Sequence, residues 1–199
     1  MVTTTRRARP MSPEDRREQI LDAAIPLILE RGAEVTTREL ADAAGIAEGT
    51  VFRVFSDKAE LIDAAVARVM DPAATLRVLE QIDPALPLEV KIEHIVAVLH
   101  SHVRGVVRFM TVLGPREHKR HAPGDDHPHR RPPLAETTSV VTRLLEPDQD
   151  RLRVPVATAV DYLRILVFGT TMPFLATDAA SDPSELADFI LRGIATEGD

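Results

Sequence analysis

Apolar residues recur every three or four positions along most of this chain, which is the spacing of one face of an α-helix. In the first third of the chain, this pattern predicts helices at 13–31, 37–44, 48–55 and 56–70. Ser12, Thr36 and Ser56 are expected to cap the helices at 13–31, 37–44 and 56–70. Strand-like alternation with a period of two is missing from the sequence, so an all-α protein is predicted.

The later part of the chain continues the helical pattern. Its longest periodic run covers 88–113, and further helices are predicted at about 133–146, 155–175 and 183–195. Prolines, histidines and mixed charges fill 115–132, which predicts a loop. The run at 155–175 is apolar on nearly every side, which is typical of a helix covered on two faces.

Composition narrows the class of protein. The 199 residues are 44% apolar and 28% charged, as in ordinary globular proteins, and the absence of cysteine excludes disulfides and thiolate metal sites. We expect no membrane-spanning segment and no signal peptide, and therefore a cytoplasmic protein. Phosphate loops, nucleophile elbows and paired helical metal ligands are missing from the sequence, so neither an enzyme nor a bound cofactor is expected.

One segment carries a specific motif. Residues 36–58, TTRELADAAGIAEGTVFRVFSDK, contain two short helices that meet at Gly45. Ala41 is small enough for the two helices to cross closely, Gly45 can take the left-handed turn, and Val51 would pack the second helix on the first. The segment is therefore interpreted as a helix-turn-helix.

This stretch resembles the TetR family of bacterial transcriptional regulators over residues 13–62. The resemblance implies a flexible basic arm at 1–12, a three-helix DNA-binding domain at 13–60 and a helical ligand-binding and dimerisation domain at 61–199. It further implies a ligand-responsive regulator, expected to be a repressor, that binds a near-palindromic operator as a homodimer. The matching positions are Glu30, Arg31, Gly32, Thr37, Arg38, Glu39, Leu40, Ala41, Ala44, Gly45, Ile46, Gly49, Thr50, Val51, Phe52, Phe55 and Lys58.

The same resemblance implies which residues would contact DNA, and the chain departs from the family at three positions. Phe52 stands where the family often has tyrosine, Val54 where histidine is common, and Glu48 where lysine is common. These changes suggest weak nonspecific affinity for DNA. Phe52 could instead belong to the core. The expected DNA-contacting residues are Thr37, Arg38, Glu48, Gly49, Thr50, Phe52, Arg53 and Lys58.

Charge argues partly against DNA binding. Residues 1–60 hold nine Lys and Arg against eleven Asp and Glu, whereas DNA-binding domains are usually basic. Arg38 and Arg53 could therefore be ordinary surface charges. Arg6, Arg7 and Arg9 could form a solubilising tail or contact DNA. A helical dimer that has lost DNA binding remains an alternative function.

The second half of the chain is expected to hold a mostly apolar pocket for a small organic inducer, and a dimer interface. In the pocket, His102 could contact the inducer or be a hydrogen-bonded core residue. The expected lining is Leu99, His102, Val106, Phe109, Met110, Leu113, Val140, Val141, Leu144, Leu163, Leu166 and Val167. The expected interface residues are Leu186, Phe189, Ile190 and Ile194, on one stripe of the last helix.

Four histidines in the loop raise a second alternative. The histidines, at positions 118, 121, 127 and 129, lie close to Asp125 and Asp126. These residue types suit zinc, but their spacing is irregular. No metal site is therefore predicted, and a metal-responsive regulator remains the alternative.

Overall fold

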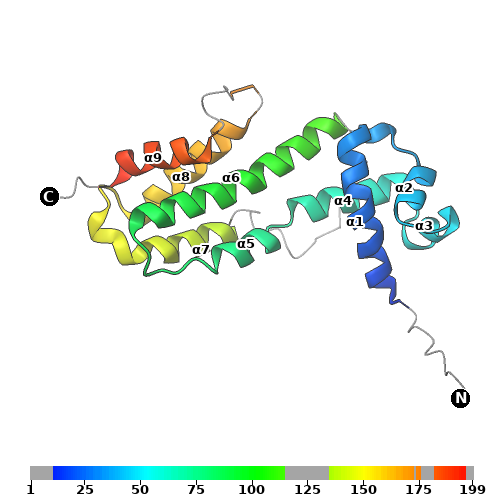
Figure 1. Ribbon diagram of the computed structural model, residues 1–199, viewed down its shortest axis with the longest axis horizontal. Helices are drawn as coiled ribbons and strands as arrows, with labels where there is room; N and C mark the ends of the chain where they lie inside the picture. Colours follow the sequence, from blue (N-terminus) through cyan, green and yellow to red (C-terminus); the bar gives the residue numbers. More distant parts are fainter. Residues whose placement is uncertain (1–10, 115–134, 173, 176–181, 196–199) are drawn as a thin grey trace, which may run out of the picture. The chain divides into compact units, whose positions relative to one another are not determined.

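The computed structural model describes residues 11–114, 135–172, 174–175 and 182–195 (Figure 1). Within these ranges the regular structure is helical, apart from one isolated β-bridge between Leu152 and Ala195, which confirms the predicted all-α fold. The α-helices are α1 (Pro13–Arg31), α2 (Thr37–Ala43), α3 (Glu48–Val54), α4 (Lys58–Met70), α5 (Ala73–Leu79), α6 (Leu88–Leu113), α7 (Ala135–Leu145), α8 (Val156–Thr171) and α9 (Pro183–Ile194). Short 3₁₀ helices lie at Gly32–Glu34 (η1) and Glu146–Arg151 (η2).

Side-chain caps explain several helix starts. The Ser12 hydroxyl accepts a hydrogen bond from the backbone N–H of Asp15 at 3.0 Å, and α1 follows directly. The start of α4 differs from the prediction. The N–H of Glu60 donates to the Asp57 carboxylate at 2.8 Å, so Asp57 and not Ser56 caps this helix. Asp57 lies immediately before the first helical residue, which is the position from which a side chain reaches the N–H three residues on.

The first of two compact units comprises the described residues up to Val69 together with Phe109–Gly114, the last turns of α6 and the residue after them. The predicted domain boundary after residue 60 falls inside α4, whose apolar side belongs to the core of this unit. That core is formed by Ile20, Leu21, Ala24, Ile28, Val35, Leu40, Ala41, Ala44, Val51, Phe55, Leu61, Ile62, Ala65, Phe109 and Leu113.

The second unit comprises Met70–Arg108 and the described residues from Ala135 onward. Its apolar core is drawn from α5, α6, α7, α8 and α9. One charge lies inside it: the side chain of Lys91 is only 1% exposed. Its ammonium donates to the carbonyl oxygens of Pro84 and Leu144, at 2.9 and 3.0 Å, and to the carboxylate of Asp148. This network ties α6 to the end of α7 and to η2.

One helix bears on the expectation of no membrane-spanning segment. By length and composition alone, α6 is long and apolar enough to cross a bilayer, with a mean hydropathy of 1.3 over its most apolar window. Several apolar side chains of α6 are buried within the protein. Ile92, Ile95 and Val96 belong to the second core, and Phe109 and Leu113 belong to the first. A core helix of a helical protein passes the same test, so α6 is weak evidence for a membrane segment.

Candidate nucleic-acid interface and ligand pocket

Helices α2 and α3 form the predicted helix-turn-helix. Gly45, between them, has a φ of +66°, a conformation that L side chains rarely adopt. The turn is closed by a hydrogen bond of 3.0 Å from the N–H of Ile46 to the carbonyl of Ala41. Ala41 and Val51 are buried, which is the close crossing that the small residue was expected to allow.

Helix α3 exposes the side that was expected to meet DNA. Phe52 is 48% exposed, so it is a surface residue and does not belong to the core. Glu48, Gly49 and Arg53 are also exposed, and Thr50 is half-buried. The helix therefore presents an aromatic ring, a cation, a carboxylate and a hydroxyl to its surroundings.

A hydrogen bond links the first turns of the two motif helices. The Thr37 hydroxyl donates to the Glu48 carboxylate at 2.7 Å. Because this bond holds the carboxylate in place, Glu48 presents an oriented negative charge at the start of α3. Thr37 would have to release Glu48 to donate this hydroxyl to a phosphate, while Arg38 beside it is exposed.

Lys58 is tethered near the start of α2. Its ammonium donates to the carbonyl of Ala33 at 2.7 Å. Glu39 lies in the same neighbourhood, and hydrogen bonds from the backbone and hydroxyl of Thr36 lower the pKa of this carboxyl, with Arg31 and Lys58 adding to the effect. The hydrogen bond to Ala33 holds the Lys58 ammonium beside η1, which precedes α2.

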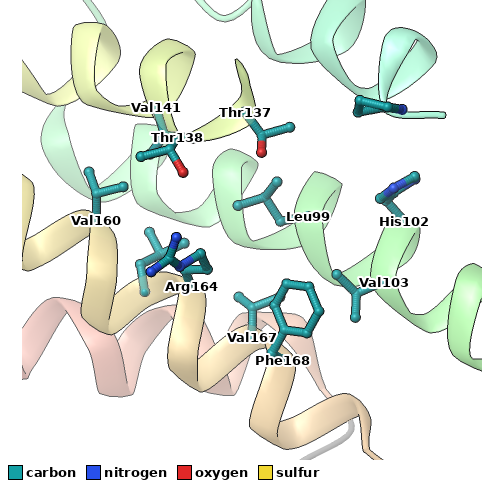
Figure 2. A pocket seen from close by; sticks show the side chains of 12 residues that line it. Leu99, His102, Val103, Thr137, Thr138, Val141, Val160, Arg164, Val167 and Phe168 are labelled. Carbon is teal, nitrogen blue, oxygen red and sulfur yellow. The ribbon is translucent and has the colours of Figure 1, made fainter. Parts of the chain in front are cut away.

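A small cavity lies among α6, α7 and α8 in the second unit (Figure 2). Its volume is about 40 Å³. Five residues that were expected in the pocket line it: Leu99, His102, Val141, Leu163 and Val167. The remaining lining residues are Pro72, Val103, Thr137, Thr138, Val160, Arg164 and Phe168.

The other expected pocket residues lie elsewhere, which corrects the prediction. Phe109 and Leu113 are buried in the first core, because α6 continues past the pocket and its last turns pack in the other unit. Met110 is exposed and Val106 is half-buried away from the cavity lining. Val140 and Leu144 are buried in the second core, and Leu166 packs against it.

His102 is the half-buried polar residue of the long helix that faces this cavity. Burial lowers the pKa of its imidazole, and the nearby charge of Asp71 opposes that shift only in part. The imidazole is therefore favoured in its neutral form, which can both donate and accept a hydrogen bond. The place of His102 in the lining is compatible with a polar contact to a ligand.

The last helix shares its apolar residues between the core of its own unit and an exposed hollow. Leu186, Ile190 and Ile194 are buried in the second core of their own chain, because this stripe of α9 is covered by the rest of that unit. Phe189 is 66% exposed and borders a shallow hollow with Tyr162 and Ile165 of α8, which are 50% and 60% exposed. An apolar surface is thus present on α8 and α9. Three of the four expected interface residues, Phe189, Ile190 and Ile194, border its hollow, and Phe189 is the exposed one among them.

Two predicted features fall outside the described residues. They are the arm with Arg6, Arg7 and Arg9, and the histidine-bearing segment 118–129. Among the residues that the structure describes, three or more His, Asp or Glu side chains are nowhere gathered so as to hold a metal ion.

Comparison with known proteins finds a family that part of the first unit resembles. Residues 20–65 match the sequence model of the bacterial regulatory proteins of the tetR family. This matched segment, the TetR-type domain, is similar to the N-terminal domain of that family. The chain is 40% identical over 57 residues to the transcriptional repressor KstR2 of Rhodococcus jostii, a stretch that covers 28% of each chain. KstR2 of Mycolicibacterium smegmatis is 32% identical over 63 residues, or 31% of each chain.

Solved structures extend the likeness in fold beyond the TetR-type domain. The repressor NalD of Pseudomonas aeruginosa superposes with a TM-score of 0.57 at 21% identity, covering 93% of this chain and all of NalD. The superantigen PfiT superposes with a TM-score of 0.61 at 23% identity, covering 94% of this chain and all of PfiT. Proteins described by such different functions share this fold, so function has to be argued from the sites.

The three positions at which the TetR-type domain departs from the family pattern differ in their surroundings. The ring of Phe52 is exposed without the hydroxyl that a tyrosine would offer to phosphate. Val54 is half-buried and packs against the first core, which limits its contact with a base. Glu48 is exposed but already accepts a hydrogen bond from Thr37.

Sequence reasoning missed several pocket residues. On α8, Val160 lies three positions before Leu163 and Arg164 three positions before Val167, so the helical period could have found them. Thr138 precedes Val141 by one turn of α7 and carries the same signal. Pro72 precedes α5, and no periodicity relates it to the other helices.

Proposed function

We propose that this protein is a ligand-responsive transcriptional regulator that binds a near-palindromic DNA operator as a homodimer. The observation that carries the proposal is the exposed side of α3 in a TetR-type helix-turn-helix. The relatives KstR2 and NalD, both described as repressors, favour repression as the outcome of binding. A regulator of this kind would act in the cytoplasm, and it requires no catalytic chemistry of its own.

Sequence would be read by α3 in the major groove. Arg53 offers a planar pair of donors that suits guanine, and Thr50 offers a hydroxyl. Contacts to phosphate would come from Thr37 and Arg38 at the start of α2 and from Lys58, and these would set the register without reading the sequence. Two-fold symmetry would place the recognition helices about 34–36 Å apart, which is one turn of DNA.

The acidic character of this domain shapes how it binds. Residues 1–60 carry a net charge of −2 when nine Lys and Arg are set against eleven Asp and Glu. Electrostatic attraction to phosphate supplies most nonspecific affinity. We therefore expect weak binding to random DNA, with a larger share of the operator affinity coming from base contacts.

Dimerisation would use the exposed apolar surface of α8 and α9. Tyr162, Ile165 and Phe189 project from it and would be covered by the same residues of a second copy across a two-fold axis. Continuous exposed apolar surface of this kind marks interaction sites.

A small apolar ligand would act through the cavity between α6, α7 and α8. Release from the operator requires that the ligand binds more tightly to a conformation that no longer fits the DNA. A tenfold loss of operator affinity needs only about 1.4 kcal/mol of such a preference. This is within reach of one or two good contacts.

Selection of bound sequences from random DNA with the full-length protein tests the proposal. We expect enrichment of a near-palindromic site. Arg53→Ala should weaken binding to that site more than to random DNA. Lys58→Ala should weaken both, and it should reduce the slope of log affinity against log salt concentration by about one. Arg77→Ala, at an exposed position of α5, is the control and should change neither. No enrichment of any sequence at moderate salt would refute DNA regulation as the function.

A further inference from the structure

The cavity between α6, α7 and α8 has one polar corner. Arg164 of α8 lines it together with Thr137 and Thr138 of α7, and nearly all the remaining lining is aliphatic or aromatic. In Figure 2 the guanidinium of Arg164 points from α8 towards the side on which the two threonines lie, while His102 lies apart from it. A permanent cation and hydroxyl groups therefore converge on one part of an otherwise apolar cavity.

The charge of this corner is open to a ligand. None of the described residues that line the cavity carries a carboxylate. Arg164 does have a partner, Asp161, one turn earlier on the same helix, at 3.0 Å. Both side chains of this pair are partly exposed, and exposed pairs of this kind hold together weakly. A guanidinium has five donors in a fork that matches a carboxylate, so Arg164 can bind a second anion from the side of the cavity.

The size of the cavity restricts the rest of the ligand. A volume of about 40 Å³ is far below the roughly 300 Å³ or more of pockets that hold drug-sized molecules. Side chains must therefore move when a ligand enters, and a narrow hydrocarbon chain requires the least movement. Leu99, Val103 and Val167 offer it an aliphatic path away from Arg164. At the far side His102 is favoured in its neutral form, so only one end of the cavity holds a fixed charge.

We propose that the ligand of this cavity is an unbranched aliphatic monocarboxylate, with its carboxylate on the Arg164 guanidinium and its alkyl chain among the aliphatic side chains of α6, α7 and α8. The hydroxyl of Thr138 donates a second hydrogen bond to the carboxylate. This proposal rests on the proposed function in treating the cavity as the regulatory site. It adds the chemical class of the signal.

Calorimetric titration of the full-length protein with octanoate, octanol and octylamine tests the proposal. The three probes share a chain and differ in the charge of the head. Wild type should bind octanoate about tenfold more tightly than octanol, equivalent to about 1.4 kcal/mol, and octylamine most weakly. Arg164→Gln should lose that tenfold preference and still bind octanol. Arg192→Gln removes a similar exposed pair, Arg192 with Asp188 on α9, and should behave as wild type.

Thr138→Val gives an independent measurement, because it removes the hydroxyl with little change of shape. It should weaken binding of octanoate and leave that of octanol unchanged. Three results would overturn the proposal: equal affinity of wild type for octanoate and octanol, an unchanged preference in Arg164→Gln, or no binding of octanoate up to about 1 mM. Tighter binding of naphthoate than of octanoate would show that the ligand is not an unbranched aliphatic chain.

Operator binding without ligand separates this proposal from the proposed function. If wild type and Arg164→Gln both bind the selected operator but octanoate does not bind, the ligand class is wrong and the regulator stands. If wild type selects no operator, the proposed function fails, whatever octanoate does.

Discussion

Among single residues, two glycines with the same backbone conformation differ in their surroundings. Gly32 has a φ of +67°, and a Cβ added there would lie 2.8 Å from the carbonyl oxygen of Val112 in α6. Gly45 has a φ of +66°, and a Cβ there would meet nothing within 4 Å. The first glycine therefore serves both a turn and a close approach of two backbone segments, whereas the second serves only a turn.

This difference predicts unequal losses of stability. Gly45→Ala should lower the free energy of unfolding by about 1–2 kcal/mol, the cost of a left-handed alanine. Gly32→Ala should lose more than that, because its methyl group also collides with a backbone atom. Urea unfolding of the two variants measures the difference. If both variants lost the same free energy of unfolding, the backbone near Val112 would have to move away from the added methyl group without loss of stability.

Because the ammonium of Lys91 is buried, replacing Lys91 with an uncharged side chain of similar size should strongly lower the stability of the protein. Lys91→Met should lower the free energy of unfolding by about 3–5 kcal/mol, because it leaves two carbonyl oxygens without their donor and Asp148 with only the more exposed Arg151 as a partner, at 3.6 Å. Arg192→Met, which breaks an exposed pair with Asp188, should cost about 1 kcal/mol or less. Chemical denaturation compares the two variants. A loss for Lys91→Met no greater than for the control would contradict the burial of this network.

At the level of elements, the capping box of α2 should give the stability a specific dependence on pH. The pKa of Glu39 is lowered by its hydrogen bonds with Thr36, so the ionised carboxylate stabilises the folded state. That stabilisation is present above the pKa of the unfolded chain, about 4.3, and is lost as the pH falls through the lower pKa of the folded state.

Glu39→Gln cannot undergo this titration. Its free energy of unfolding should lie below that of wild type at neutral pH, and the gap should narrow as the pH falls below about 4. Thermal or urea unfolding from neutral to acidic pH measures the gap. Asp42→Asn, exposed on the same helix, controls for the loss of one negative charge. A gap that stays constant with pH would refute this account of the cap.

For the whole molecule, the exposed surface of α8 and α9 predicts a dimer that one charge can break. Phe189→Asp would place an unpaired carboxylate in the interface, and light scattering should find the monomer. Val78→Asp puts the same charge at another exposed apolar residue, outside that hollow, and should remain dimeric. Wild type that scatters as a monomer at micromolar concentration would remove the proposed interface.

Local signals in the sequence were enough to predict most of the helices and the helix-turn-helix. The apolar period marks which residues share a face, and caps such as Ser12 and the Thr36–Glu39 pair act within one turn. The glycine turn at position 45 and the buried Val51 follow from the same short-range rules. The fold class and the place of the candidate DNA interface were therefore predictable.

Only the tertiary structure decided which neighbour covers each apolar face. Phe109 shares a helix with Leu99 but is buried in the first core, whereas Leu99 lines the cavity of the second. Ile190 of α9 faces the core of its own chain, whereas Phe189, the residue before it, is exposed. Lys91 is buried because Asp148, 57 positions later, folds back onto it. Periodicity describes one helix at a time, whereas burial depends on partners that are distant in the chain.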